Sequence, residues 1–112
     1  MFSINDLNIS ITRGDTASIE ITFEGDIPTD GDLVVMSLKR TTSIKTPIWE
    51  KTGECEDGTI IFNISSDDTK DLPFGTYAWD IRIFYKDGQV TSPFKPKDFK
   101  VMEVVTNNDR EP

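Results

Sequence analysis

A proline- and glycine-containing turn that opens into a strictly alternating segment constrains the fold of this chain more than any other feature. Residues 72–85 read Leu-Pro-Phe-Gly-Thr-Tyr-Ala-Trp-Asp-Ile-Arg-Ile-Phe-Tyr. From Tyr77 to Tyr85, aromatic or branched apolar residues occupy every second position. A period of two is typical of a β-strand with one buried face, and it is incompatible with the 3.6-residue period of a helix. The segment therefore predicts a half-buried strand over residues 77–85.

The start of this strand also predicts a local motif. Tyr77 follows Gly75 and precedes Trp79 by two positions, a spacing typical of the tyrosine corner of immunoglobulin-type sandwiches. We expect the Tyr77 hydroxyl to bond to a nearby backbone group and Trp79 to be buried. Phe84 and Arg82 lie on the opposite parity, so we expect them to mark a contact face.

Other segments predict further strands separated by turns at regular spacing. Alternation or apolar runs place these strands at about 7–12, 17–24, 33–40, 47–51, 59–64, 90–94 and 98–105. The continuous apolar start of 33–40 predicts a central strand covered on both faces, and Pro47 predicts an edge strand. Ser65 or Ser66 is expected to cap a single helical turn that Pro73 ends.

Two turns carry strong local signals. Arg13-Gly14-Asp15 separates the first two predicted strands, and Gly14 is free to take the positive φ that such a turn uses. Asp87-Gly88 is a hairpin signal after the long strand. The whole pattern predicts an all-β fold, an immunoglobulin-like antiparallel β-sandwich of seven to eight strands with one short helical turn. We expect one domain over residues 1–106 and a flexible C-terminal tail over 107–112.

Charge argues against two classes of partner. The chain has 112 residues, with twenty acidic against twelve basic side chains and a net charge of −8. Phosphate backbones and anionic membrane surfaces are bound by basic stripes, so we expect neither nucleic acid nor a membrane as partner. The segment after Met1 lacks a basic region followed by a long apolar run, so we expect no signal peptide and synthesis in the cytoplasm.

Residue types also argue against catalysis. The sequence has no histidine, which removes Ser-His and Cys-His triads and most zinc sites. Its single cysteine, Cys55, lies in a segment that we expect to be an acidic loop, where neighbouring carboxylates disfavour the thiolate. Paired carboxylates could serve a glycosidase, but a small sandwich has little room for the required cleft. We expect no enzyme activity and no cofactor.

Three weaker motifs have competing interpretations. Arg13-Gly14-Asp15 spells an integrin-binding tripeptide, but a turn that needs glycine explains it better. Trp49 could stack on sugars, although an edge-strand tryptophan that covers the core is preferred. Two aspartate-rich segments could gather calcium, although solvated turns are preferred over a site. Their residues are Asp26, Asp30 and Asp32 in one, and Asp67, Asp68 and Asp71 in the other.

The order of several short motifs resembles a class of small phage and prophage proteins. The chain has Arg-Gly-Asp-Thr at 13–16, Ser-Ser-Asp-Asp-Thr at 65–69, Pro-Phe-Gly-Thr-Tyr-Ala-Trp-Asp at 73–80 and Asp-Gly at 87–88. In this order they resemble the N-terminal domain of baseplate upper proteins of phages that infect Gram-positive bacteria. Phe74 departs mildly from the pattern, where proline-glycine is more usual. The similarity covers about residues 9–106.

This resemblance implies a non-catalytic virion structural protein of the tail, baseplate or neck. Its implied partners are other virion proteins, a homo-oligomer is possible, and its implied location is the virion. The shared residues Gly14, Asp15, Gly75, Tyr77 and Trp79 would be architectural. The alternative function is an immunoglobulin-like adhesion or carbohydrate-binding module of a bacterial surface protein. The candidate interaction residues are Trp49, Arg82 and Phe84.

Overall fold

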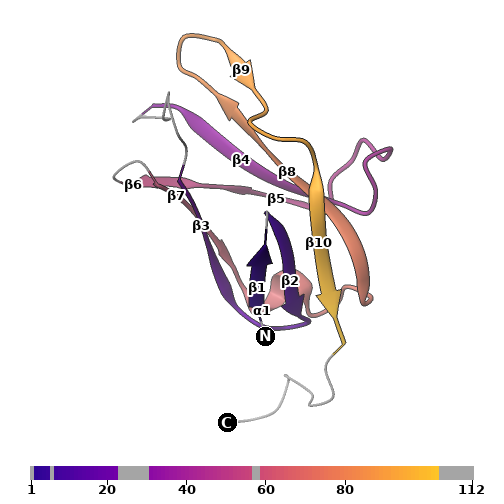
Figure 1. The fold of residues 1–112 in the computed structure, drawn as a ribbon. Coiled ribbons are helices and arrows are strands. Elements are labelled where there is room, and N and C mark those ends of the chain that lie inside the picture. The colour runs from indigo at the N-terminus through magenta and orange to yellow at the C-terminus, as the bar shows by residue number, and fades with distance from the viewer. Residues whose placement is uncertain (1, 6, 23–30, 57–58, 104–112) are drawn as a thin grey trace.

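The computed structural model describes residues 2–5, 7–22, 31–56 and 59–103 as two packed β-sheets with one short helix (Figure 1). The prediction of a β-sandwich with one helical turn is confirmed. The strands are β1 (Phe2–Asn5), β2 (Asn8–Thr12), β3 (Ala17–Thr22), β4 (Leu33–Lys39), β5 (Trp49–Thr52), β6 (Glu54–Glu56), β7 (Thr59–Ile64), β8 (Gly75–Phe84), β9 (Val90–Thr91) and β10 (Lys97–Met102), and the helix is α1 (Ser66–Thr69).

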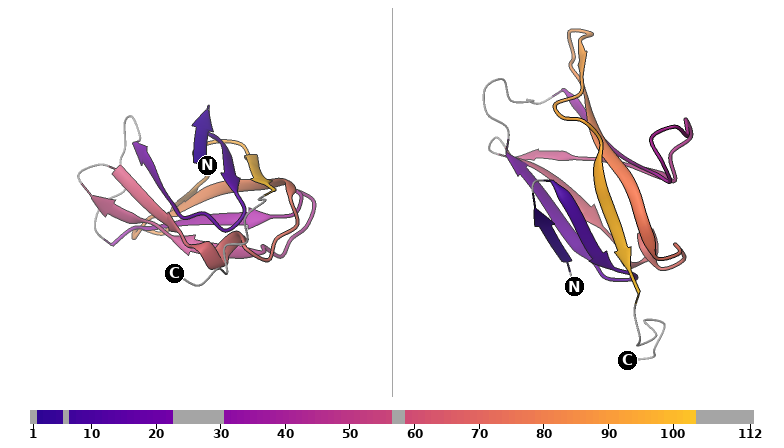
Figure 2. Two further views of the ribbon diagram at one scale, coloured as in Figure 1. Left: turned by 90° about the horizontal axis from the view of Figure 1, so that it is seen from below. Right: turned by 45° about the vertical axis from the view of Figure 1, so that its right-hand side comes forward.

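The two sheets differ in size. The larger has the order β1-β2-β10-β8-β4-β5, and β9 pairs with the far end of β8. The smaller has the order β3-β7-β6. The strand β8 is long enough to pair with β10 near its start and with β9 near its end. The β8–β9 hairpin consequently stands away from the rest of the molecule, at the top of Figure 1 and in the right-hand view of Figure 2.

Alternating side chains from both sheets form one core. In β8 every second residue from Tyr77 to Ile83 is buried, as the period-two pattern predicts. Trp79 is only 1% exposed and is among the largest fully buried side chains. The sheets supply further buried residues from β2, β3, β4, β7 and β10: Ile9, Ile11, Ile19, Ile21, Val34, Met36, Leu38, Ile60, Phe62, Ile64, Phe99 and Val101.

Three details of the predicted strand plan are wrong. The described part of the chain has ten strands rather than seven or eight, because β1 is additional to the plan and the segment after β5 forms β6 instead of a loop. The sandwich is not wholly antiparallel, since β10 pairs with β2 in parallel. Pairing between residues about ninety positions apart leaves no local sequence signal. Because β6 replaces the expected loop, Cys55 lies in a strand and is partly buried against the core.

The strand β4 is central in its sheet, but it is covered on one face only. Val34, Met36 and Leu38 point into the core and are fully buried. Leu33 and Val35 point outward, and Leu33 is 45% exposed. The continuous apolar run thus combines a core face with an apolar outer face, and the prediction of cover on both faces is wrong.

A glycine joins the two sheets. Gly53 lies between β5 of the larger sheet and β6 of the smaller one, and its N–H still donates to the Val34 carbonyl at 2.8 Å. A Cβ at this position would lie 2.6 Å from Ile60 Cγ2 and 2.8 Å from Phe62. Only glycine therefore lets the chain pass this close to β7 as it changes sheets.

The turn between β2 and β3 is fixed by α1. Gly14 has a φ of 87°, as expected, and its buried N–H donates to Thr69 Oγ1 at 2.8 Å. The N–H of Asp15 donates to the Thr12 carbonyl, which closes the turn. At the start of α1 the Ser65 N–H donates to the Asp68 carboxylate at 2.6 Å. The short helix thus ties the β2–β3 turn to the end of β7.

The predicted tyrosine corner forms. The Tyr77 hydroxyl donates to the Pro73 carbonyl at 2.6 Å, two residues before Gly75 starts β8. The Trp79 indole N–H donates to the Leu7 carbonyl at 2.9 Å, and Leu7 has a positive φ of 67°. Within the described residues α1 is the one helix, and it is far too short to cross a bilayer. The predicted tail at 107–112 lies outside the described residues.

Candidate functional site

Three exposed apolar side chains form a row across the outer face of the larger sheet. Leu33 of β4 is in register with Phe84 of β8, and Phe84 is in register with Val90 of β9. These residues are 45%, 37% and 45% exposed. We call Leu33, Phe84 and Val90 the apolar row. Pairing of β4, β8 and β9 makes it continuous, at the end of the sheet where the hairpin projects (Figure 1).

Charged side chains follow the apolar row on the same face. Arg82 and Val35 form the adjacent register pair, and Asp80 and Ser37 form the next. Because side chains two positions apart share a face, Arg82 lies between the apolar row and Asp80. No ion pair joins Arg82 or Asp80 to another described residue. The outer face therefore changes from apolar to cationic to anionic along β8.

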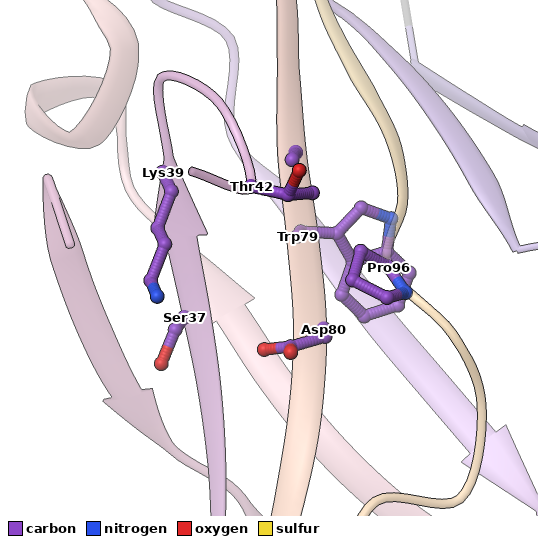
Figure 3. Close-up of a pocket in the computed structure, with 7 residues that line it drawn as sticks. Ser37, Lys39, Thr42, Trp79, Asp80 and Pro96 are labelled. Carbon is purple, nitrogen blue, oxygen red and sulfur yellow. The ribbon is translucent and has the colours of Figure 1, made fainter. Parts of the chain in front are cut away.

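A shallow pocket lies at Asp80 on this face, and Lys39 is its other charged lining residue (Figure 3). Ser37 and Lys39 of β4 and Asp80 of β8 project from neighbouring strands, and Thr42 and Pro96 close the sides. Its volume is about 60 Å³, room for a few water molecules and well below the roughly 300–1,000 Å³ of pockets that bind small molecules. The pocket is too small to enclose a substrate.

The structure brings two of the three candidate interaction residues together. Arg82 and Phe84 share the outer face, as their parity predicts. Trp49 instead packs edge-on against Phe99, with ring centroids 6.0 Å apart, and its indole N–H donates to the Asp68 carbonyl at 3.1 Å. Trp49 is thus an edge-strand residue that covers the core, and its ring is no free platform for a sugar.

The aspartate segments make no metal centre within the part of the chain that the structure describes. No three His, Cys, Asp or Glu side chains there gather closely enough to hold an ion. Asp68 forms a 2.7 Å ion pair with Lys51, and Asp32 accepts a hydrogen bond from the Lys86 N–H. Asp26 and Asp30 lie outside the described residues.

The sequence interpretation misses two members of the apolar row. It identifies Phe84, because that residue breaks the core parity of its own strand. It places Leu33 in a doubly covered strand, and it treats Val90 as an ordinary strand residue. The signal that is present is the apolar character of Leu33 and Val35 on alternate positions of one strand. The register that aligns the row is a tertiary property, and no single segment encodes it.

Comparison with known proteins yields a fold relationship only. No protein-family model matches the sequence. No curated protein matches it either. Among solved structures the chain is similar to CopC from Methylosinus trichosporium OB3b, with a TM-score of 0.53 and 13% sequence identity. The superposition covers 88% of this chain and 86% of CopC. At this identity the likeness supports the shared β-sandwich and carries no information about ligands.

The prediction of a phage or prophage virion structural protein is wrong by this comparison. A solved structure that shares the architecture is CopC, and that likeness gives no support to a role in a tail, baseplate or neck. The motifs behind the resemblance encode turns and the Tyr77 corner, and many sandwiches need these for folding alone. The virion location and virion partners depended on the same resemblance and gain no support from the comparisons.

Proposed function

We propose that this chain is a non-catalytic interaction module that associates with a second copy of itself through the outer face of the larger sheet. The observation that carries this proposal is the apolar row. Isolated exposed apolar residues are ordinary on protein surfaces, whereas a contiguous apolar patch with a polar border is typical of contact surfaces. Backbone pairing of three neighbouring strands sets the spacing of the three side chains, which favours a defined contact.

The charges beside the row favour a second copy as the partner. In a two-fold interface each residue of one copy faces a residue of the other, and the reverse contact is also made. An axis between the Arg82 and Asp80 positions would place each Arg82 over the partner's Asp80 and each Phe84 over the partner's Ala78, so that the apolar row of each copy covers the far end of the other's outer face. The face is therefore complementary to itself, even though the net charge of −8 opposes association at long range.

The absence of catalysis is part of the proposal. The sequence lacks histidine, and within the described residues no metal-binding cluster forms. On the outer face the pocket at Asp80 has a volume of about 60 Å³, too small to enclose a substrate, and the larger space beside β5, about 310 Å³, is an open groove. A contact face without an enclosing pocket supports binding of a macromolecular surface rather than turnover of a small molecule.

Sedimentation equilibrium of the full chain from about 10 µM to about 1 mM tests this function, a range that spans weak dimers. We expect reversible dimerisation that Phe84→Thr weakens at least tenfold, because both copies lose the central side chain of the row. Phe74→Thr is the matched control, since Phe74 is 61% exposed and lies outside the row. A monomer throughout this range, or equal effects of the two variants, would overturn the proposal.

A mixing experiment tests the geometry of the contact. Arg82→Glu and Asp80→Lys each place like charges opposite one another in a homodimer, so each variant alone should associate more weakly. In a mixture, the glutamate introduced in one variant would face the lysine introduced in the other, and the native Asp80 and Arg82 that remain would also face each other. Both contacts are therefore restored, and we expect heterodimers to exceed either homodimer. Failure of the mixture to recover association would rule out this two-fold arrangement.

A further inference from the structure

A groove opens where the chain leaves one sheet for the other. The strand β5 pairs with β4 in the larger sheet, and β6 pairs with β7 in the smaller one. The two sheets therefore diverge on the β5 side of Gly53. The resulting groove has a volume of about 310 Å³. It is lined by Glu50, Lys51, Thr52, Glu54, Ile61 and Asn63.

One wall of the groove is a strand edge with unpaired backbone groups. Gly53 donates its N–H to Val34, so this register position is a hydrogen-bonded pair of β4 and β5. Such pairs alternate in an antiparallel ladder. The backbone groups of Lys51 therefore point to β4, and those of Glu50 and Thr52 point away from it. No described strand pairs with β5 on that side.

The opposite wall is also incomplete. The strand β7 pairs with β3 along its whole length, from Thr59 to Ile64. On its other side β6 reaches only as far as Ile61. The last part of β7, Phe62–Ile64, thus has no partner strand on the groove side within the described chain. Two incomplete sheet edges face the same space, which is the geometry that accepts an added strand.

The groove is anionic. Glu50 and Glu54 contribute two exposed carboxylates, and the Glu50 carboxylate also accepts a hydrogen bond from Ser37. The one cation in the lining, Lys51, is paired with Asp68 at 2.7 Å, so its charge is compensated within the protein. An extended peptide that carries lysine or arginine would therefore complement the lining in charge, whereas an acidic peptide would be repelled.

We infer that this groove binds an extended, basic peptide segment, which adds as a strand to the free edge of β5. Backbone hydrogen bonds to Glu50 and Thr52 would supply the affinity. The carboxylates of Glu50 and Glu54 would select side chains of positive charge. The inference does not rest on the proposed self-association, because the groove supplies none of the contacts of the apolar row. Glu50 does share the outer face with Ser37 and Asp80, so the peptide titration is made well below the dimer dissociation constant.

Titration with short peptides, followed by amide chemical shifts of the labelled full chain, tests the inference. The probe is a capped hexapeptide of alternating lysine and valine, and the charge control is the same peptide with glutamate for lysine. We expect the lysine peptide to shift the amides of Glu50 and Thr52, and the glutamate peptide to leave them unchanged. A lysine peptide that is N-methylated at every second amide, prepared in both registers, should bind at least tenfold more weakly.

Two variants distinguish binding of the peptide in the groove from general attraction to an acidic protein. Glu50→Gln combined with Glu54→Gln should weaken the lysine peptide several-fold, with a larger effect at low ionic strength. Asp98→Asn combined with Glu103→Gln is the matched control, since both acids are exposed on or just after β10, which lies three strands from β5 in the larger sheet. Three results would each overturn the inference: no shifts at Glu50 and Thr52 at millimolar peptide, equal binding of the N-methylated peptides, or shifts confined to β3.

Discussion

The two ends of this sandwich differ in how their side chains are satisfied. At the helix end, which comprises α1, the β2–β3 turn and the start of β8, polar groups are paired internally. The Tyr77 hydroxyl, the Trp49 indole and the Gly14 N–H each have a partner within the chain. At the hairpin end, where β4, β8 and β9 meet, the apolar row is exposed instead. The helix end also exposes one apolar side chain, Phe74, whereas the hairpin end aligns three in register, and that alignment is the basis of the proposed self-association.

The largest effect that distinguishes the ends should come from Thr69→Val. Thr69 is fully buried, and its hydroxyl is the acceptor for the Gly14 N–H. Valine would remove the hydroxyl that accepts the hydrogen bond of this buried N–H, which costs about 2 kcal/mol of unfolding free energy. Urea unfolding should show a lower midpoint at an unchanged m-value.

Thr91→Val at the hairpin end is the matched control for that variant. Thr91 is exposed on β9, so its loss should change the unfolding free energy by less than about 0.5 kcal/mol. Equal effects of the two threonine variants would break the comparison between the ends, because the Thr69 hydroxyl would then contribute no more than an exposed hydroxyl.

A second, smaller contrast comes from the two tyrosines of β8 and its turn. Tyr77→Phe removes the hydroxyl that bonds to the Pro73 carbonyl, and it should cost about 1 kcal/mol. Tyr85→Phe should cost less than half of that, because Tyr85 is only partly buried and packs against the edge of the core. Thermal melts monitored by circular dichroism measure both. A Tyr85→Phe variant that is destabilised more than Tyr77→Phe would contradict the prediction.

The sequence predicted the helix end better than the hairpin end, and the reason is physical. The turn closed by the Asp15–Thr12 bond and the corner closed by the Tyr77–Pro73 bond each form within a few residues, so local spacing reveals them. The bond between Gly14 and Thr69 spans 55 positions and leaves no local pattern. The alignment of the apolar row likewise depends on the register of three strands. Gly53 is the point where the chain crosses from the larger sheet to the smaller one, and the close approach of β7 requires a glycine there. The sequence around Gly53 does not encode that approach.

The ion pair that links β5 to α1 should contribute less than either hydroxyl. Lys51 Nζ lies 2.7 Å from the Asp68 carboxylate, and both side chains remain partly exposed. Exposed or partly exposed pairs contribute between about 0 and 1 kcal/mol. Lys51→Met should therefore lower the unfolding free energy by about 0.5 kcal/mol in low salt and by less in high salt. Equal losses in low and high salt would contradict this prediction and would show that packing rather than charge is lost.

The smallest effect on stability should come from Val90→Thr in the apolar row. Both side chains are β-branched, and Val90 is 45% exposed, so the unfolding free energy should change by less than about 0.5 kcal/mol. The same change places a hydroxyl in the proposed contact of both copies, so dimerisation should weaken several-fold. Because dimerisation itself stabilises the folded state, the melts must be made well below the dimer dissociation constant. A variant that lost stability but kept its dimer would reverse the roles assigned to the two ends, since the hairpin end would then serve folding rather than contact.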